Sequence, residues 1–124
     1  MDRSLRRSEI LRRKVDIERV LFRGRRLKDG PVALYYAPHP APGSRPQASS
    51  RNPARVAFIT AGKFRTNVLR NRVKRRLREI YRTNKSRFPT GFDFILRGDA
   101  AGSGMASSLL QERIVGLAER VVVL

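Results

Sequence analysis

The chain has 124 residues, no cysteine and a formal net charge of +18. This length suits one domain with a small core, and the absence of cysteine excludes disulfides and cysteine–zinc sites. No apolar run is long enough to span a membrane, and the basic N-terminus lacks the apolar core of a secretory signal, so we expect a cytoplasmic protein.

The first predicted element is a helix over residues 8–22, "SEILRRKVDIERVLF", with Ser8 as its N-cap and Gly24 as its stop. Residues 1–7 before it are expected to form a flexible basic arm, which either orders on RNA or only aids solubility. Residues 31–37, "PVALYYA", predict a strand. The Pro- and Ser-rich stretch over residues 38–53 predicts a flexible loop.

The second half continues with a strand over residues 55–61, a long basic helix over about 66–86, and a strand over residues 91–97. A last helix over residues 105–121 carries an apolar stripe, which we assign to the core although it could also contact another protein. The order α-β-β-α-β-α predicts a single α+β domain over residues 1–124, with helices and at least three strands in two layers.

The charge is concentrated in two blocks, and the stronger one is the long helix. Residues 62–87 hold 11 basic side chains and one acid, whereas residues 88–124 have a net charge of −1. At about 100° per residue, Leu69, Val73, Leu77 and Ile80 fall on one side, while Asn71, Arg75, Arg78 and Arg82 project from the other.

An apolar stripe argues against a disordered tail, and a solvated surface helix would normally mix both signs of charge. The excess of arginine over lysine instead favours phosphate binding and stacking on unpaired bases, as in structured RNA. A ribosomal or other structural RNA-binding protein fits this pattern, and a membrane-surface protein is a weaker alternative.

Few side chains in the sequence are suited to act as catalytic acids, bases or metal ligands. Asp16 and Glu18 diverge by about 160° on a helix, Asp93 is most simply a polar residue of a strand or turn, and His39 lies in the flexible "APHPAP" segment. The sequence therefore predicts no catalytic residue and no protein metal site.

The stretch "RNRVKRRLRE" over residues 70–79, which follows a strand and a lysine-containing turn, resembles the signature of the bacterial ribonuclease P protein component. The resemblance extends over nearly the whole chain, including "RVAFITAGK" and "FDFILR". It implies an endoribonuclease subunit that binds a catalytic RNA and the 5′ leader of precursor tRNA, and so assists removal of the leader. The RNA subunit is expected to supply the chemistry and to require Mg²⁺.

The resemblance also implies a mostly antiparallel central sheet packed by helices, with a left-handed β-α-β crossover. It places Ile17, Leu21 and Tyr35 in a cleft for the leader, although the family often has aromatic side chains where Ile17 and Leu21 stand. Residues carried over to the RNA-facing surface are Lys63, Arg70, Asn71, Arg72, Lys74, Arg75 and Arg78. Arg65 and Arg82 of the same basic block complete the predicted RNA-binding set. No obligatory protein partner is implied.

Overall fold

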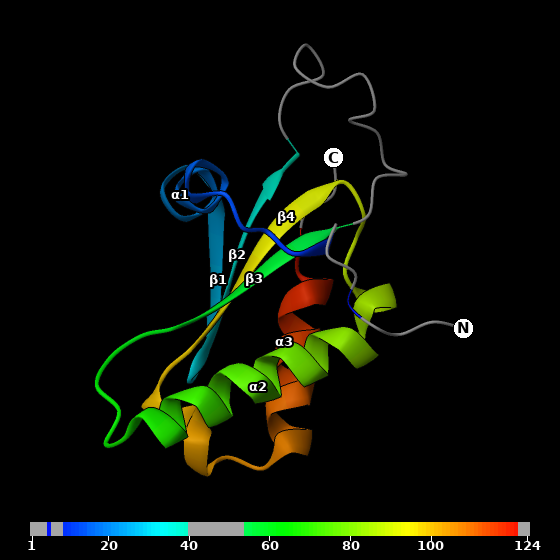
Figure 1. The fold of residues 1–124 in the computed structure, drawn as a ribbon. Coiled ribbons are helices and arrows are strands. Elements are labelled where there is room, and N and C mark those ends of the chain that lie inside the picture. Colours follow the sequence, from blue (N-terminus) through cyan, green and yellow to red (C-terminus); the bar gives the residue numbers. More distant parts are fainter. Residues whose placement is uncertain (1–4, 6–8, 40–53, 122–124) are drawn as a thin grey trace.

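The structure is a computed structural model that describes residue 5 and residues 9–39 and 54–121 (Figure 1). The predicted arm over residues 1–7 and most of the predicted loop, residues 40–53, lie outside the described residues, apart from Leu5. The helices are α1 (Lys14–Arg23), α2 (Asn67–Thr83) and α3 (Ser107–Glu119), with 3₁₀ turns at Lys85–Arg87 and Ala100–Gly104. The strands are β1 (Arg25–Asp29), β2 (Val32–Pro38), β3 (Arg55–Thr60) and β4 (Phe92–Gly98).

The four strands form one sheet in the order β1-β2-β4-β3. β2 pairs antiparallel with β1 and β4, and β3 pairs parallel with β4, so the predicted mostly antiparallel sheet is confirmed. The predicted order lacks β1, which occupies the edge. Its sequence, "RRLKD", has one apolar residue and no apolar–polar alternation. A strand at the edge of a sheet does not need that alternation, so the sequence carries no strand signal here.

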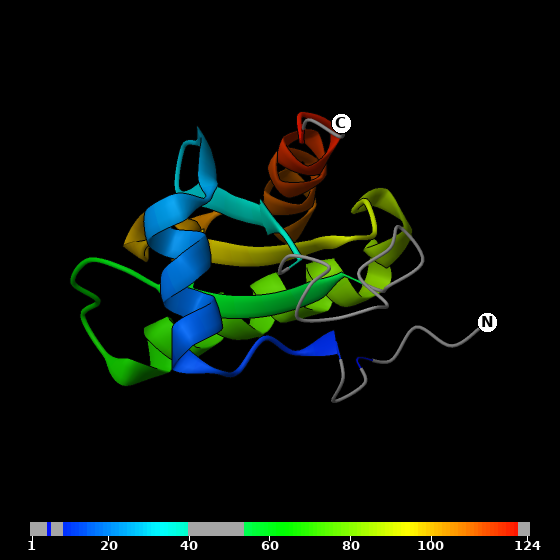
Figure 2. The ribbon, with the colours of Figure 1, turned by 90° about the horizontal axis from the view of Figure 1, so that it is seen from above.

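The parallel pair β3 and β4 is joined through α2. In Figure 2, the green β3 runs from right to left, and α2 lies behind the sheet. The yellow β4 runs parallel to β3 and lies above it in the picture. When α2 is behind the sheet and both strands point upward, β4 is therefore to the right of β3. This is the left-handed crossover implied by the family resemblance, against the general preference for right-handed connections.

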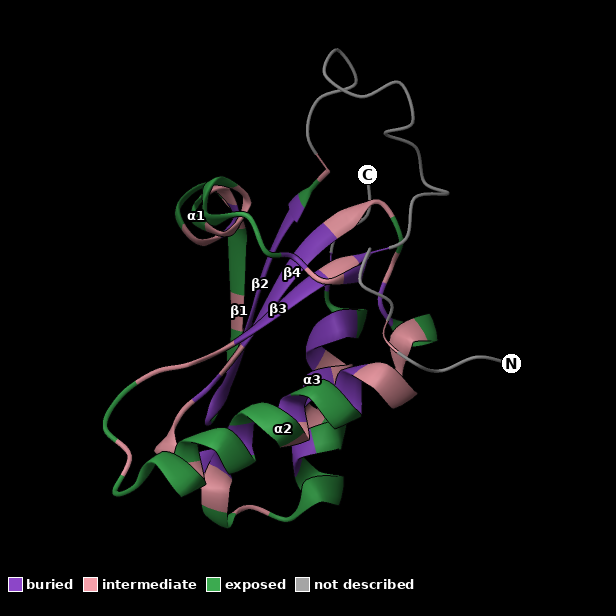
Figure 3. Ribbon diagram, in the orientation of Figure 1, coloured by how far each residue is buried: buried purple, intermediate pink, exposed green. Residues whose placement is uncertain are grey.

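The sheet buries both of its faces. Val32, Leu34 and Tyr36 of β2 join the larger core with α2 and α3, whereas Ala33 and Tyr35 join a smaller core with α1. The buried strands consequently run through the middle of the molecule (Figure 3). α1 packs on the face opposite α2 and α3, so helices cover the predicted central sheet on both sides.

α2 has the predicted amphipathic character. Val73, Leu77, Ile80 and Tyr81 are buried on its inner side. At its start, the Thr66 hydroxyl accepts a hydrogen bond from the Leu69 amide at 3.2 Å. This cap satisfies one of the otherwise unpaired amides of the first turn. The predicted end near residue 86 is three residues too late, because a separate 3₁₀ turn begins at Lys85.

α1 starts later than predicted. Ile10 forms a parallel bridge with Val56, and the Leu11 amide donates to the Val56 carbonyl at 2.8 Å, so residues 10 and 11 extend the edge beside β3. The predicted cap, Ser8, lies outside the described residues. The predicted stop at Gly24 is confirmed, because α1 ends at Arg23 and Gly24 is its C-cap. Glycine suits this position, since a Cβ there would lie 2.4 Å from the Val20 carbonyl oxygen.

A buried ionic cluster fixes α1 to the sheet. Asp93 of β4 is fully buried and accepts hydrogen bonds from Arg55 Nε at 2.8 Å and Arg55 Nη2 at 2.7 Å. Arg19 of α1 also pairs with Asp93, and its Nη1 donates to the Pro38 carbonyl at 2.9 Å. His39 Nε2 lies 3.3 Å from Asp93 Oδ1. Asp93 is a polar residue of a strand, as predicted, and its pair with Arg19 joins that strand to α1. His39 was expected only in a flexible segment, whereas the structure places it against Asp93.

α3 covers the end of the sheet beside β1 and β2. Leu110, Ile114, Leu117 and Ala118 are buried, which confirms that its apolar stripe belongs mainly to the core. Leu109 remains 39% exposed.

The cluster predicts a specific acid sensitivity. Burial would raise the pKa of Asp93, but His39 and Arg55 outweigh it and hold this pKa below its ordinary value. A lowered folded-state pKa contributes stability above the unfolded value of about 3.9 and loses it as the pH falls through the folded value. We expect Asp93→Asn to lower the free energy of unfolding by about 3 kcal/mol at pH 7, because breaking a buried pair leaves charges uncompensated.

Urea unfolding at a series of pH values from 7 to 2.5 measures this effect. The difference between wild type and Asp93→Asn should shrink below about pH 4. Glu112→Gln, at an exposed carboxylate on α3, is the matched control and should have little effect at any pH. A difference for Asp93→Asn that stays constant down to pH 2.5 would contradict the assignment.

Candidate nucleic-acid interface

The outer side of α2 presents a continuous basic surface. Its cationic residues Arg70, Arg72, Lys74, Arg75 and Arg78 are all exposed, as is Asn71. Figure 3 shows this side of α2 as exposed along the helix, with the buried residues turned to the sheet. The helix therefore brings these predicted residues together on one face, which we call the α2 basic face.

Ion pairing leaves most of this face available. Arg82, at its end, is half-buried and paired with Glu79 on the same helix, with Nε 3.1 Å from Oε2. Within the described residues, the other cations of the α2 basic face have no carboxylate partner. Arg75 and Arg78 project as predicted, whereas Arg82 is partly committed within the protein.

The turn before α2 adds to the same positive surface. Lys63 and Arg65 are exposed, and Gly62 has φ +81°, a left-handed conformation that favours glycine. Arg70 lies over the Phe64 ring, with its guanidinium carbon 5.7 Å from the ring centroid. The first turn of α2 contains no acidic residue, so the positive end of the helix dipole also faces an incoming anion.

Other cations of this block serve the fold. Arg76 Nη1 donates to the Met105 carbonyl at 2.6 Å, which ties α2 to the segment before α3. Lys85 pairs with Glu9 at 3.1 Å, and Arg87 pairs with Glu119 at 3.4 Å. The net charge of residues 62–87 therefore overstates the number of cations available to RNA.

A second surface lies on the opposite face of the sheet. Ile17 and Leu21 of α1 pack beside Tyr35 and Ile59 over a floor of small side chains, so the predicted cleft residues do lie together. The Tyr35 hydroxyl accepts a hydrogen bond from Arg97 Nη1 at 3.0 Å. The guanidinium carbon of Arg26 lies 5.9 Å from the Tyr35 ring centroid.

Sequence reasoning missed the cations of this surface, namely Arg26, Lys28 and Arg97. Their shared face follows from the strand register, which sets Arg26 opposite Tyr35 and both Lys28 and Arg97 opposite Ala33. The register could not be inferred because β1 itself was not predicted.

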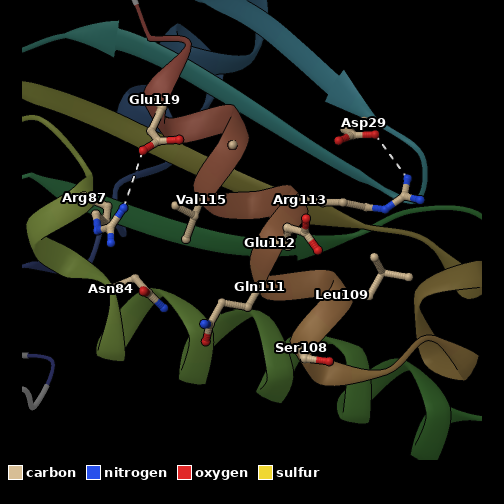
Figure 4. Close-up of a pocket in the computed structure, with 11 residues that line it drawn as sticks. Asp29, Asn84, Arg87, Ser108, Leu109, Gln111, Glu112, Arg113, Val115 and Glu119 are labelled. Carbon is tan, nitrogen blue, oxygen red and sulfur yellow. Dashed lines mark hydrogen bonds and ion pairs between the residues drawn. The ribbon is translucent and has the colours of Figure 1, made fainter.

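A pocket of 760 Å³ lies along α3 (Figure 4). Its walls carry the ion pairs Asp29–Arg113 and Arg87–Glu119, and Glu112 lies between them. Carboxylates along this groove would repel phosphates, so it is a poor site for a polyanion. Among the described residues there is no group of three potential metal-ligating side chains of the His, Cys, Asp or Glu type. None of the described helices is both long and apolar enough to cross a bilayer.

The family model described as Ribonuclease P matches residues 5–122. The ribonuclease P protein component of Petrotoga mobilis is 37% identical over 92 residues, which are 74% of this chain and 70% of that protein. The ribonuclease P protein component of Pelotomaculum thermopropionicum is 29% identical over 112 residues, which are 90% of this chain and 91% of that protein.

Solved structures share the fold. The RNase P protein from Thermotoga maritima superposes with a TM-score of 0.74 at 23% identity, covering 92% of this chain and 98% of that one. The Staphylococcus aureus RNase P protein gives a TM-score of 0.71 at 18% identity, covering 90% and 93%. The extent of the family match and the identity to the Petrotoga protein show that this chain belongs to the ribonuclease P protein family.

Proposed function

We propose that the chain binds the catalytic RNA of ribonuclease P through the α2 basic face, together with Lys63 and Arg65 of the preceding turn. The observation that carries this proposal is the row of exposed cations on α2 that no described carboxylate neutralises. Such a row repels itself unless a polyanion compensates it.

The contribution of this face is electrostatic. Each arginine or lysine that contacts a phosphate releases counterions and reduces repulsion between RNA segments. Close approach of the precursor tRNA to the catalytic RNA, and of Mg²⁺ to both, then becomes less costly. The RNA subunit would supply the chemistry and hold the Mg²⁺, and the protein would act with them in the cytoplasm.

The cleft between α1 and the sheet would bind the 5′ leader of precursor tRNA. Ile17 and Leu21 of α1 pack against the buried cluster that contains Tyr35 of the sheet. A groove that joins apolar side chains to neighbouring cations suits a single strand, whose bases are apolar on their faces and whose backbone is negative. The leader would thus reach the protein on the face opposite the α2 basic face.

Reconstitution tests the function directly. We expect this protein to stimulate cleavage of precursor tRNA by a bacterial ribonuclease P RNA at low Mg²⁺ concentration, where repulsion between the RNAs is least screened. The assay follows release of the 5′ leader with and without protein. If the protein binds RNA but stimulates no bacterial ribonuclease P RNA, the alternative of a purely structural RNA-binding protein is favoured.

The α2 basic face predicts a change in salt dependence. We expect Arg72→Ala to weaken binding to the catalytic RNA and to reduce the slope of log K against log salt by about one, because one phosphate contact is lost. Filter binding at several salt concentrations measures this slope. Arg120→Ala, at an exposed arginine beyond the end of α3, is the charge-matched control and should leave the slope unchanged. An unaltered slope for Arg72→Ala would remove that residue from the interface.

A further inference from the structure

Three cations gather at the end of the sheet face that α1 leaves open. Arg26 and Lys28 lie on β1, and Arg97 lies on β4. The register places Arg26 opposite Tyr35, and places Ala33 between Lys28 and Arg97. Residues that pair directly across strands point to the same face, so the three side chains border the same small area of the sheet.

The space among these cations is the size of a small ionic group. A pocket of 80 Å³ is lined by Arg26, Lys28, Ala33 and Arg97, together with Pro31, Val32 and Asp99. This volume equals that of about two or three water molecules in the liquid, which a single phosphate group could replace. The Ala33 side chain is small enough to leave the pocket open between the longer side chains.

The charge of this pocket is strongly positive. Asp99 is the carboxylate on its rim, and its Oδ1 already accepts a hydrogen bond from the Ala101 amide at 3.0 Å. In the part of the chain that the structure describes, Arg26, Lys28 and Arg97 form no ion pair with a carboxylate. Three neighbouring cations with no such partner are stabilised by an anion.

Tyr35 holds two of these cations in place. Its hydroxyl accepts the hydrogen bond from Arg97 at 3.0 Å, and Arg26 lies over its ring at 5.9 Å. The side chain is only 9% exposed. The ring is therefore already covered and offers little open face to a nucleobase, whereas its oxygen and its π-face orient the guanidinium groups.

We propose that Arg26, Lys28 and Arg97 bind one backbone phosphate of the single-stranded leader, and that Tyr35 is the positioning residue for Arg97 and Arg26. This proposal rests on the proposed function, since it takes the leader to lie in the cleft beside α1. Because every nucleotide has the same phosphate, leader recognition at this point is independent of base identity.

The test uses the reconstituted holoenzyme and precursor tRNAs in which single leader positions are modified. A methylphosphonate removes the charge of one phosphate, and an abasic nucleotide removes one base but keeps the phosphate. We expect one methylphosphonate position to weaken substrate binding about ten- to hundredfold, the range for losing a charge-assisted hydrogen bond. An abasic nucleotide on either side of that phosphate should change binding less than about twofold.

Variants connect the phosphate to these residues. Arg97→Gln and Arg26→Gln should each weaken binding of the unmodified precursor and reduce the cost of the methylphosphonate, because each variant has already lost part of the same contact. Tyr35→Phe keeps the ring but removes the acceptor for Arg97, so it should produce part of the loss. Tyr35→Ala should produce at least as much. Arg120→Gln serves as the charge-matched control and should leave the methylphosphonate effect intact.

Two results would overturn the phosphate site. One is an abasic nucleotide that costs as much as the methylphosphonate. The other is wild-type binding by Tyr35→Phe when Tyr35→Ala is impaired, which would show that the ring itself contacts the base. Failure of the leader cleft as a whole looks different: leader-bearing and leaderless tRNAs would bind equally well to every variant, while the protein still bound the catalytic RNA. Arg26 is exposed, so its variant keeps the test valid if Arg97→Gln does not fold.

Discussion

The arrangement of both surfaces depends on one sheet that fills its two faces with side chains of different size. On β2, alternation sends Leu34 and Tyr36 toward α2 and α3, and sends Ala33 and Ala37 toward α1. The large side chains on the first face pack against α2 and bury its Leu77 and Tyr81. The alanines of the second face let α1 approach closely beside Tyr35 and Ile95. One strand pattern thus separates the α2 basic face from the surface around Tyr35.

Two polar anchors hold this arrangement in place. The Asp93 cluster joins β3, β4 and α1, so α1 is fixed to the sheet by buried charge pairs. The bond from Arg76 to the Met105 carbonyl joins α2 to the segment that leads into α3. Such anchors are specific in direction, whereas apolar burial alone would allow a helix to slide or rotate. The anchors involve arginines, and their contacts within the protein make these arginines unavailable to the α2 basic face.

The amphipathic helix could be predicted from the sequence because its signal is local, and the inward stripe and the outward cations both follow from 3.6 residues per turn. The edge strand β1 could not be predicted, since exposed residues such as Arg25 and Lys28 carry no strand periodicity. The contacts of His39 and Asp93 were missed because they join residues 38 or more positions apart in the sequence. The cations around Tyr35 were missed for the same reason, as only the register places them on one face. Local periodicity therefore predicts the amphipathic basic helix, and tertiary pairing decides the rest of the candidate site.

The central claim is that the α2 basic face, rather than the α3 side, lies against the catalytic RNA. The chain has no cysteine, so a single Lys74→Cys or Glu112→Cys substitution provides a unique attachment point for a hydroxyl-radical-generating iron chelate on either side. In the reconstituted complex, the chelate at position 74 should cleave the catalytic RNA at a small, defined set of nucleotides, and the chelate at position 112 should leave those nucleotides intact. Strong cleavage from position 112 with none from position 74 would contradict the account.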